Sequence, residues 1–200
     1  MSPFDTKQKA FYSQSFNNND FSCQILESIE FEDCTFEQCN FSNAIFKLCK
    51  FIDCRFVKCN LSMVNIGFSQ FNDVCFENSK VIGIDWTKAN WPNLALFSPI
   101  KFSHCIINDC LFFGLELKEL TLENCKAHDV DFREGDFSQG NFSYSDFSNS
   151  LFSKTNLQSV NFTEASNYQI DIYNNNISQA KFSRYQAVAL LDSLDIELLD

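Results

Sequence analysis

Cysteine offers this chain its widest choice of chemistry, because ten of the 200 residues are cysteines. Cys34, Cys39, Cys49, Cys54 and Cys59 recur in steps of five. Paired zinc ligands are typically separated by only two to four residues, so this spacing argues against a metal centre. We predict that the protein binds no metal and no cofactor.

The redox state of these thiols depends on where the chain resides. The N-terminal residues lack the apolar core of a signal peptide, and no stretch reaches the ~18 apolar residues of a membrane span. We therefore expect a cytoplasmic protein without membrane contact, in which cysteines stay reduced. A reduced cysteine is best treated as a small apolar filler.

Catalytic constellations are missing from the sequence. The two histidines, His104 and His128, fall at positions that we expect to face outward. The chain has no glycine-rich phosphate loop, no His-Glu-x-x-His motif and no serine-centred elbow. We predict that it is not an enzyme.

A large apolar residue recurs at every fifth position. The first series runs from Phe11 to Leu96, and a second begins at Phe102 and runs to Phe182, broken at Asn167. The two series contain 20 of the 24 phenylalanines. Between them we infer a one-residue register slip at 97–101, which predicts a kink or a widened corner rather than a projecting loop.

The position two residues before each large residue is small. Eight of the ten cysteines occupy it, and alanine, serine, glycine and valine fill most of the others. The three remaining positions of each step are mostly polar. A period of five fits neither a helix nor a long strand, whose periods are about 3.6 and 2. It fits a chain that runs extended for two or three residues and then turns a corner.

These patterns predict an all-β solenoid. Each step points one large and one small side chain into a narrow lumen, and successive coils pair about 4.8 Å apart. Four steps per coil are suggested by Asp33, Asp53 and Asp73, which recur every twenty residues. Cys34 and Cys54 recur at the same interval.

The chain divides into three segments. Residues 1–10 form an N-terminal extension, 11–182 the solenoid and 183–200 a C-terminal cap, because a solenoid end must be covered. Ser183 to Gln186 resembles a capping box that precedes a short helix. The cap carries more apolar surface than one coil needs, so we expect it also to form a homodimer. The candidate interface is Val188, Leu190, Leu191, Leu194, Ile196 and Leu198.

The charge by itself indicates mainly solubility, although it would also attract a basic protein surface. Twenty-six acidic side chains oppose fifteen basic ones, giving a net charge of −11 that repels nucleic acid and anionic membranes. Columns of carboxylates about 4.8 Å apart would resemble the phosphates of DNA, ~3.4 Å apart on each strand. For single residues such as Asp131 and Asp146, the preferred interpretation is turn stabilisation. The candidate partner-binding residues are Asp33, Asp53, Asp73, Glu32, Glu37, Glu77, Asp109 and Asp129.

The individual steps resemble a known family. Cys39-Asn40-Phe41-Ser42-Asn43 and Ser145-Asp146-Phe147-Ser148-Asn149 are similar to the steps of pentapeptide-repeat proteins. The resemblance covers nearly the whole chain. It implies a right-handed quadrilateral β-helix with a short C-terminal helical cap.

Some members of that family are acidic, C-terminally dimerised rods that mimic DNA and bind DNA gyrase. The segment from Tyr185 to Leu194 is similar to the C-terminus of the Qnr-type members. Non-repeat segments, including Leu26 to Ile29 and Ser193 to Leu198, look more like albicidin-resistance members from xanthomonads. The resemblance implies a gyrase-binding protein that counters a topoisomerase poison, whereas the missing projecting loop argues against quinolone protection. Two alternatives stay open, an acidic scaffold for another basic protein and direct sequestration of a toxin.

Overall fold

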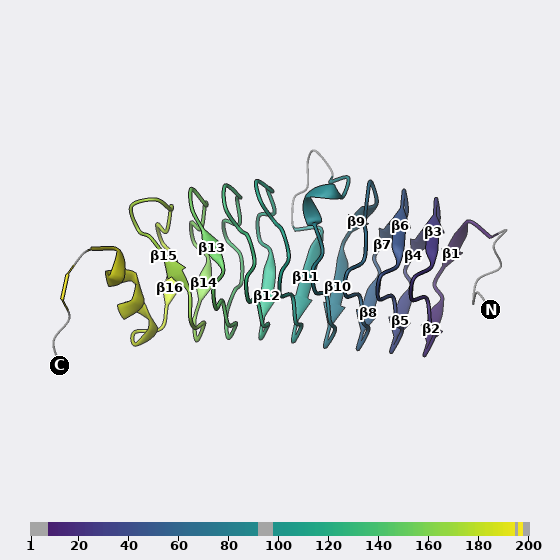
Figure 1. Ribbon diagram of the computed structural model, residues 1–200, viewed down its shortest axis with the longest axis horizontal. Helices are drawn as coiled ribbons and strands as arrows, with labels where there is room; N and C mark the ends of the chain where they lie inside the picture. The colour runs from purple at the N-terminus through teal and green to yellow at the C-terminus, as the bar shows by residue number, and fades with distance from the viewer. Residues whose placement is uncertain (1–7, 92–97, 195, 198–200) are drawn as a thin grey trace.

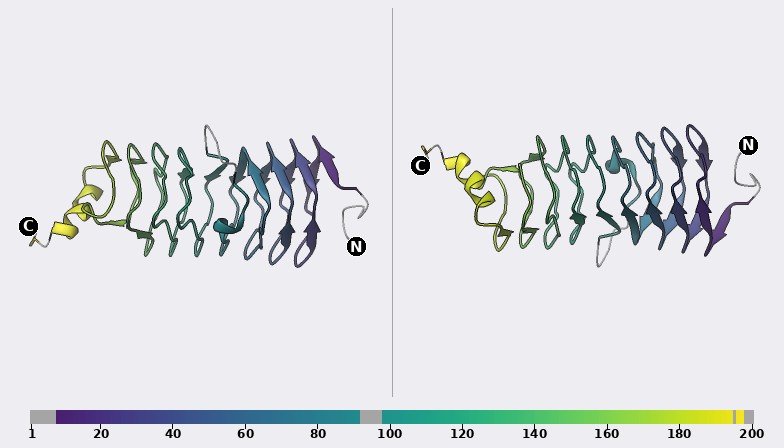
Figure 2. Two further views of the ribbon diagram at one scale, coloured as in Figure 1. Left: turned by 90° about the horizontal axis from the view of Figure 1, so that it is seen from above. Right: turned by 90° about the horizontal axis from the view of Figure 1, so that it is seen from below.

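The repeating five-residue steps fold into an elongated rod. The computed structural model describes residues 8–91, 98–194 and 196–197. They form a right-handed β-helix of about eight turns, with β1 at one end and a short helix at the other (Figure 1). The coils stay stacked in the same way when the rod is seen from above and from below (Figure 2). The predicted fold class is confirmed.

Four faces follow one another around each coil. Face 1 contains β1 (Ala10–Tyr12), β4 (Glu30–Glu32), β7 (Lys50–Ile52) and β9 (Gln70–Asn72). Face 2 contains β2 (Ser15–Asn17), β5 (Thr35–Glu37), β8 (Arg55–Val57), β10 (Val74–Glu77), β11 (Ile100–Ser103), β12 (Thr121–Glu123), β14 (Asn161–Phe162) and β16 (Lys181–Phe182). All of these strand pairs are parallel, as a single winding direction requires.

Faces 3 and 4 are held by shorter pairings. Face 3 consists of isolated bridges such as that between Asp20 and Asn40. Face 4 contains β3 (Ile25–Glu27), β6 (Ile45–Lys47), β13 (Leu151–Phe152) and β15 (Gln169–Ile170). Two 3-10 helices complete the structure, η1 (Trp86–Lys88) in the fourth coil and η2 (Gln186–Leu194) after the last one.

The coil length of four steps is confirmed by the register. Phe11 pairs with Phe31, Phe31 with Phe51 and Phe51 with Phe71. Identical side chains therefore stack along the lumen, and the rings of Phe31 and Phe51 lie 5.2 Å apart, nearly parallel. Burial of these rings supplies most of the hydrophobic stabilisation, roughly 1.5–3 kcal/mol for each.

Residues at the small inward position also form hydrogen bonds to the backbone. The hydroxyl of Ser145 accepts a hydrogen bond from the Cys125 amide at 2.8 Å and donates one to the Leu122 carbonyl at 2.6 Å. Where the residue is cysteine, its thiol makes the second contact, as between Cys49 Sγ and the Leu26 carbonyl at 3.2 Å. These bonds satisfy corner groups that the strand ladders leave unpaired, which size and apolarity alone did not predict.

The corner two residues after each large residue adopts a left-handed backbone conformation. Asp33 and Asn43 have φ angles of 52° and 57°, values that Asp and Asn tolerate well. Bulky residues share the conformation, since Leu48 and Phe68 have φ angles of 56° and 59°. The repeat thus imposes a backbone conformation that is unfavourable for these residue types.

The inferred one-residue slip is wrong in length. Phe56 pairs with Phe76, twenty residues on, but Phe76 pairs with Phe102, twenty-six residues on. Six additional residues therefore lie between Trp91, on face 1, and Phe102. An insertion of six residues shifts a five-residue period by only one position. Leu96 is apolar and stands five residues after Trp91, so the sequence period continues unbroken as far as Leu96. Residues 92–97 lie outside the described residues, so the expectation of no projecting loop stays untested there.

A second departure occurs near the C-terminal end. Phe152 pairs with Ile170, eighteen residues on, instead of with Ile172 as the period predicts. The predicted capping box does not form, because Ser183 Oγ donates to Glu164 Oε1 at 2.7 Å on the preceding coil. The helix that follows is of the 3-10 type and covers the last coil with Ala189 and Leu190.

Candidate partner-binding surface

Three predicted carboxylates form a true column. Asp33, Asp53 and Asp73 each lie three residues before a central residue of face 2, and their φ angles are 52°, 51° and 51°. All three are exposed at the corner between faces 1 and 2, which we call the first corner. The parallel register repeats this corner once per coil, about 4.8 Å along the rod.

A second row runs beside this column on face 2. Glu37 and Glu77 each pair with Val57, Glu77 also pairs with Ser103, and Ser103 pairs with Glu123. Glu123 therefore continues the row beyond the long coil, by which we mean the coil that contains the six additional residues. Its neighbour Glu119 lies three residues before Leu122 of face 2 and has a φ of 62°, so it continues the first-corner column.

The sequence analysis missed Glu119 and Glu123. Leu122 pairs with Phe102, and Phe102 pairs with Phe76, so Glu119 lies in the same column as Asp73, two coils further along the rod. This alignment can be found only once the six additional residues are known. The first corner thus bears acidic side chains on both sides of the long coil. We call the following set the acidic strip: Glu32, Asp33, Glu37, Asp53, Asp73, Glu77, Glu119 and Glu123.

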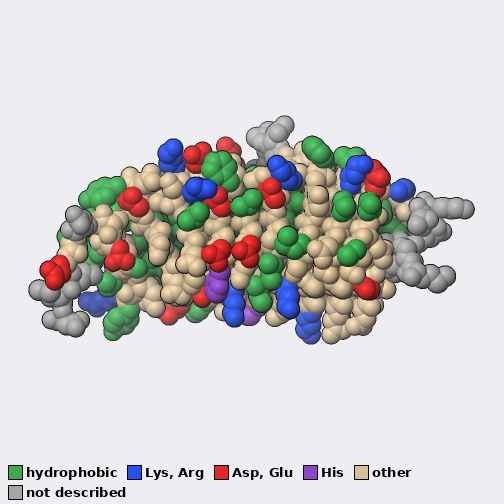
Figure 3. All heavy atoms as spheres, in the orientation of Figure 1, with side chains coloured by type: hydrophobic (Ala, Val, Ile, Leu, Met, Phe, Trp, Pro, Cys, Tyr) green, Lys and Arg blue, Asp and Glu red, His purple; other side chains and the backbone are tan. Residues whose placement is uncertain are grey.

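Basic side chains interrupt the middle of the acidic strip. Lys101 Nζ lies 2.8 Å from Asp73 Oδ1, and Arg55 Nη2 lies 2.9 Å from Glu77 Oε1. Among residues 8–91, 98–194 and 196–197, the other six members make no ion pair. The strip therefore has an acidic N-terminal part, a neutralised centre and an acidic part beyond it. In the view of Figure 3, acidic and basic side chains are likewise interspersed along the rod.

Asp109 and Asp129 do not belong to the strip. Each follows a central residue of face 3 by two positions, and their φ angles are 59° and 56°. They are exposed at the corner between faces 3 and 4, which we call the third corner. A four-sided coil places the first and third corners diagonally opposite each other. One flat partner surface cannot cover both.

The carboxylates just before central residues stabilise turns, as expected. Asp131 Oδ1 accepts the Arg133 amide at 3.0 Å, and Asp146 Oδ1 accepts the Ser148 amide at 3.1 Å. Partial burial opposes ionisation of Asp146, but hydrogen bonds from Asn167, Ser148 and His128 outweigh it and lower the pKa to about 2. The hydrogen bond to the Arg133 side chain likewise lowers the pKa of Asp131, against partial burial.

His128 and Ser148 bond to the same carboxylate, that of Asp146. His128 Nε2 is 2.9 Å from Asp146 Oδ2, while Ser148 Oγ donates to Asp146 Oδ1 at 2.7 Å. Because the serine bonds to the carboxylate and not to the imidazole, the histidine is not positioned to take the serine proton. In the described part of the chain no three His, Cys, Asp or Glu side chains could hold a metal ion.

The predicted dimer residues that the structure describes lie on η2 and just after it. Val188 is 48% exposed and Ile196 is 53% exposed, whereas Leu190, Leu191 and Leu194 are half-buried. Leu198 lies outside the described residues. The cap thus leaves apolar surface uncovered after closing the last coil.

The repeat itself decides the family. The sequence matches the model of the Pentapeptide repeat region over residues 29–96 and 91–162, more than half of the chain. The chain belongs to the pentapeptide-repeat family. Among curated protein sequences, none matches this pentapeptide-repeat protein significantly.

Solved pentapeptide-repeat proteins have the same fold. A trypsin-treated variant of QnrB1, a plasmid-mediated fluoroquinolone resistance protein, has a TM-score of 0.73 and 17% identity, covering 96% of this chain and 100% of that one. Full-length QnrB1 has a TM-score of 0.58 and 18% identity, covering 94% and 100%. HetL of Nostoc sp. strain PCC 7120, involved in heterocyst differentiation regulation, has a TM-score of 0.51 and 11% identity, covering 87% of each chain. Within the described residues, no helix is long and apolar enough to cross a membrane.

Proposed function

We propose that this pentapeptide-repeat protein binds DNA gyrase through the acidic strip and protects it from a topoisomerase poison. The proposal rests most on one observation, the continuation of the strip in register across the long coil. From Asp33 to Glu119 the first corner spans four coil steps, or roughly 19 Å. The shared fold with QnrB1, a fluoroquinolone resistance protein, supports the same function.

The binding mechanism is electrostatic mimicry, without catalysis. A surface that normally grips DNA carries basic side chains placed to meet phosphates. Within the strip, Asp33, Asp53 and Asp73 are exposed at about 4.8 Å intervals and offer a similar line of charge on a rigid support. Asp73 and Glu77 already have basic partners within the chain, so Glu32, Asp33, Glu37 and Asp53 are the strongest candidates for direct contact.

Two finer features complete the proposal. Similarity of non-repeat segments to albicidin-resistance members favours albicidin as the countered poison. The exposed apolar surface of Val188 and Ile196 favours a homodimer formed by the two caps. A dimer would join two acidic strips in one longer particle.

A supercoiling assay tests the proposal. Purified gyrase is poisoned with albicidin or a fluoroquinolone and mixed with the wild type or with Asp33→Asn/Asp53→Asn/Asp73→Asn. We expect the wild type to restore supercoiling and the triple variant to lose protection while remaining folded. The matched control, Asp109→Asn/Asp129→Asn, neutralises the diagonally opposite corner and should protect like the wild type.

Three measurements separate the alternatives. Protection by a folded variant in which Glu32, Asp33, Glu37, Asp53, Glu119 and Glu123 are all neutralised would contradict binding through the strip. Failure of the wild type to bind gyrase in a pull-down would favour a different basic partner. Binding of the poison to the protein without gyrase would favour direct sequestration.

A further inference from the structure

The C-terminal departure from the repeat builds a site that the acidic strip does not use. Asn167 occupies the position of a central residue, yet it is exposed and has a φ of 57°. The next residue, Tyr168, enters the lumen in its place and is only 2% exposed. Its ring lies 5.7 Å from that of Phe162 and 5.5 Å from that of Phe182.

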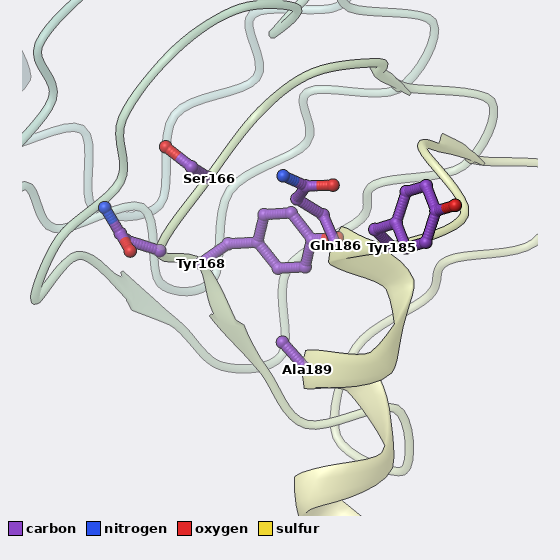
Figure 4. Close-up of a pocket in the computed structure, with 6 residues that line it drawn as sticks. Ser166, Tyr168, Tyr185, Gln186 and Ala189 are labelled. Atoms are coloured by element: carbon purple, nitrogen blue, oxygen red, sulfur yellow. The ribbon is translucent and has the colours of Figure 1, made fainter. Parts of the chain in front are cut away.

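A pocket lies at this point between the last coils and η2. Its volume is about 300 Å³, and it is lined by Ser166, Asn167, Tyr168, Tyr185, Gln186 and Ala189. Figure 4 shows the Tyr168 side chain pointing from the coil toward the first turn of η2, where Gln186 and Tyr185 project. This volume is at the lower end of the range for small-molecule sites.

Tyr168, which lines the pocket, carries a hydroxyl that is buried and unpartnered. Its oxygen is closed to solvent and has no hydrogen-bond partner among the residues that the structure describes. Burial raises the pKa of Tyr168 to about 12, so the hydroxyl stays uncharged. A buried hydroxyl without a partner destabilises the folded protein, and phenylalanine would fill the same volume without that cost. The tyrosine therefore indicates a ligand that supplies the missing partner.

The other lining groups define what that ligand must be. Asn167 Nδ2 donates to Asp146 Oδ1 at 2.8 Å, which leaves the amide oxygen of Asn167 as an acceptor. Gln186 can donate and accept, and its amide makes no hydrogen bond within the described ranges. No lining residue is charged. A charged ligand would be desolvated here without a counter-ion, which is costly.

We propose that this pocket binds a small, uncharged aromatic molecule through an amide or hydroxyl group that hydrogen-bonds to Tyr168. The ring of the ligand packs against Tyr185, which is 88% exposed at the rim, and its polar group reaches the Tyr168 hydroxyl. Access requires the half-buried Gln186 side chain to turn away from the Tyr168 hydroxyl. Binding then holds η2 against the last coil.

Ligand-observed NMR with the full chain tests this site. The probes are benzamide and benzyl alcohol, with benzoate as the charged analogue and toluene as the analogue without a polar group. We expect the first two to bind, and benzoate and toluene to bind at least tenfold more weakly. Tyr168→Phe should weaken benzamide at least tenfold. The matched control, Tyr173→Phe, removes an exposed hydroxyl outside the pocket and should bind like the wild type.

Melting of the variants supplies the second readout. Without a probe, Tyr168→Phe should melt at the same temperature as the wild type or higher, because no hydrogen bond is lost. A second variant, Ala189→Leu, fills the pocket from the helix and should block benzamide while leaving Tyr168 in place. Unchanged benzamide affinity in both variants, equal binding of benzoate, or no benzamide binding at millimolar concentration would overturn the proposal.

Discussion

At the scale of single residues, the lumen makes two separate demands. The central position needs a large ring that stacks on its counterpart in the next coil, as Phe36 does on Phe56 with centroids 4.7 Å apart. The small position needs a modest volume, and where serine, threonine or cysteine fills it the side chain also hydrogen-bonds to a corner carbonyl, as Ser145 and Cys49 do. Burial raises the pKa of Cys54 and of Cys110 to about 12, so neither thiol is reactive near neutral pH.

Removal of one stacked ring should strongly destabilise the folded protein. Phe41 is fully buried, and its neighbours are fixed by strand pairing, so they have little freedom to collapse into a cavity. We expect Phe41→Ala or Phe142→Ala to lower the free energy of unfolding by about 3–5 kcal/mol. Ser42→Ala, at an outward position next to Phe41, is the matched control. Equal denaturation midpoints for Phe41→Ala and Ser42→Ala would contradict the inward assignment.

Asp146 should make the free energy of unfolding depend on pH. Its folded-state pKa of about 2 lies below the ordinary value of 3.8, so folding favours the ionised form. The stabilisation is complete above about pH 4 and is lost as the pH falls through about 2. Melting between pH 5 and pH 2 should therefore decline less steeply in Asp146→Asn than in the wild type. Ser148→Ala, which removes one of the donors to the carboxylate, should be intermediate, and identical pH profiles would argue against this contribution.

At the scale of elements, the two ends of the solenoid face different problems. Strand β1 begins the ladder at Ala10, whereas the last coil is irregular and is covered by η2. The helix packs Ala189 and Leu190 against the core and leaves Val188 half-exposed. One short element therefore combines a covering function with the proposed dimer contact, and the two can be separated by mutation.

Truncation after Phe182 should remove both functions. We expect the shortened chain to aggregate, because Tyr168, Ile177 and Phe182 lose their cover. Val188→Asp places a charge on the exposed side of η2 and should yield folded monomers instead. Mass by light scattering distinguishes these results. A dimer mass retained by Val188→Asp would move the interface away from this side of the cap.

At the scale of the whole molecule, the rod is a support that repeats its surface once per coil. A net charge of −11 acts over the entire length, but the acidic strip occupies one corner and the two faces that meet there. The third corner, with Asp109 and Asp129, faces the opposite direction. The molecule can thus meet a partner along one side while the other remains free.

The salt dependence of gyrase binding should reveal which side is used. Attraction between exposed charges is screened over about 8–10 Å at ordinary ionic strength, so binding of the wild type should weaken steeply as salt increases. Neutralising Asp33, Asp53 and Asp73 should weaken binding at low salt and flatten this dependence. Neutralising Asp109 and Asp129 should change the affinity little. Equal salt dependence for both variants and the wild type would rule out strip-mediated attraction.

Periodicity by itself predicted the solenoid and most of its inward residues, and it suggested the length of its coil. Each of these depends on local repetition: a ring every five residues must enter the lumen, and Asp33, Asp53 and Asp73 recur at the interval of one coil. The acidic column of the first corner was therefore predictable as far as Asp73. The burial of eight cysteines, with Cys23 exposed and Cys75 half-buried, followed from the same register.

Only the tertiary structure decided which steps stack upon one another. The pairing of Phe76 with Phe102 and of Phe152 with Ile170 is a contact between coils. An insertion of six residues shifts a period of five by only one position. The two residues lost before Ile170 are restored by Asn176, which again pairs twenty residues on from Asn156. These contacts bring Glu119 and Glu123 into the acidic strip and place Asp109 and Asp129 on the opposite corner. They also turn Tyr168 into the lumen, where its hydroxyl lies unpartnered beneath the cap.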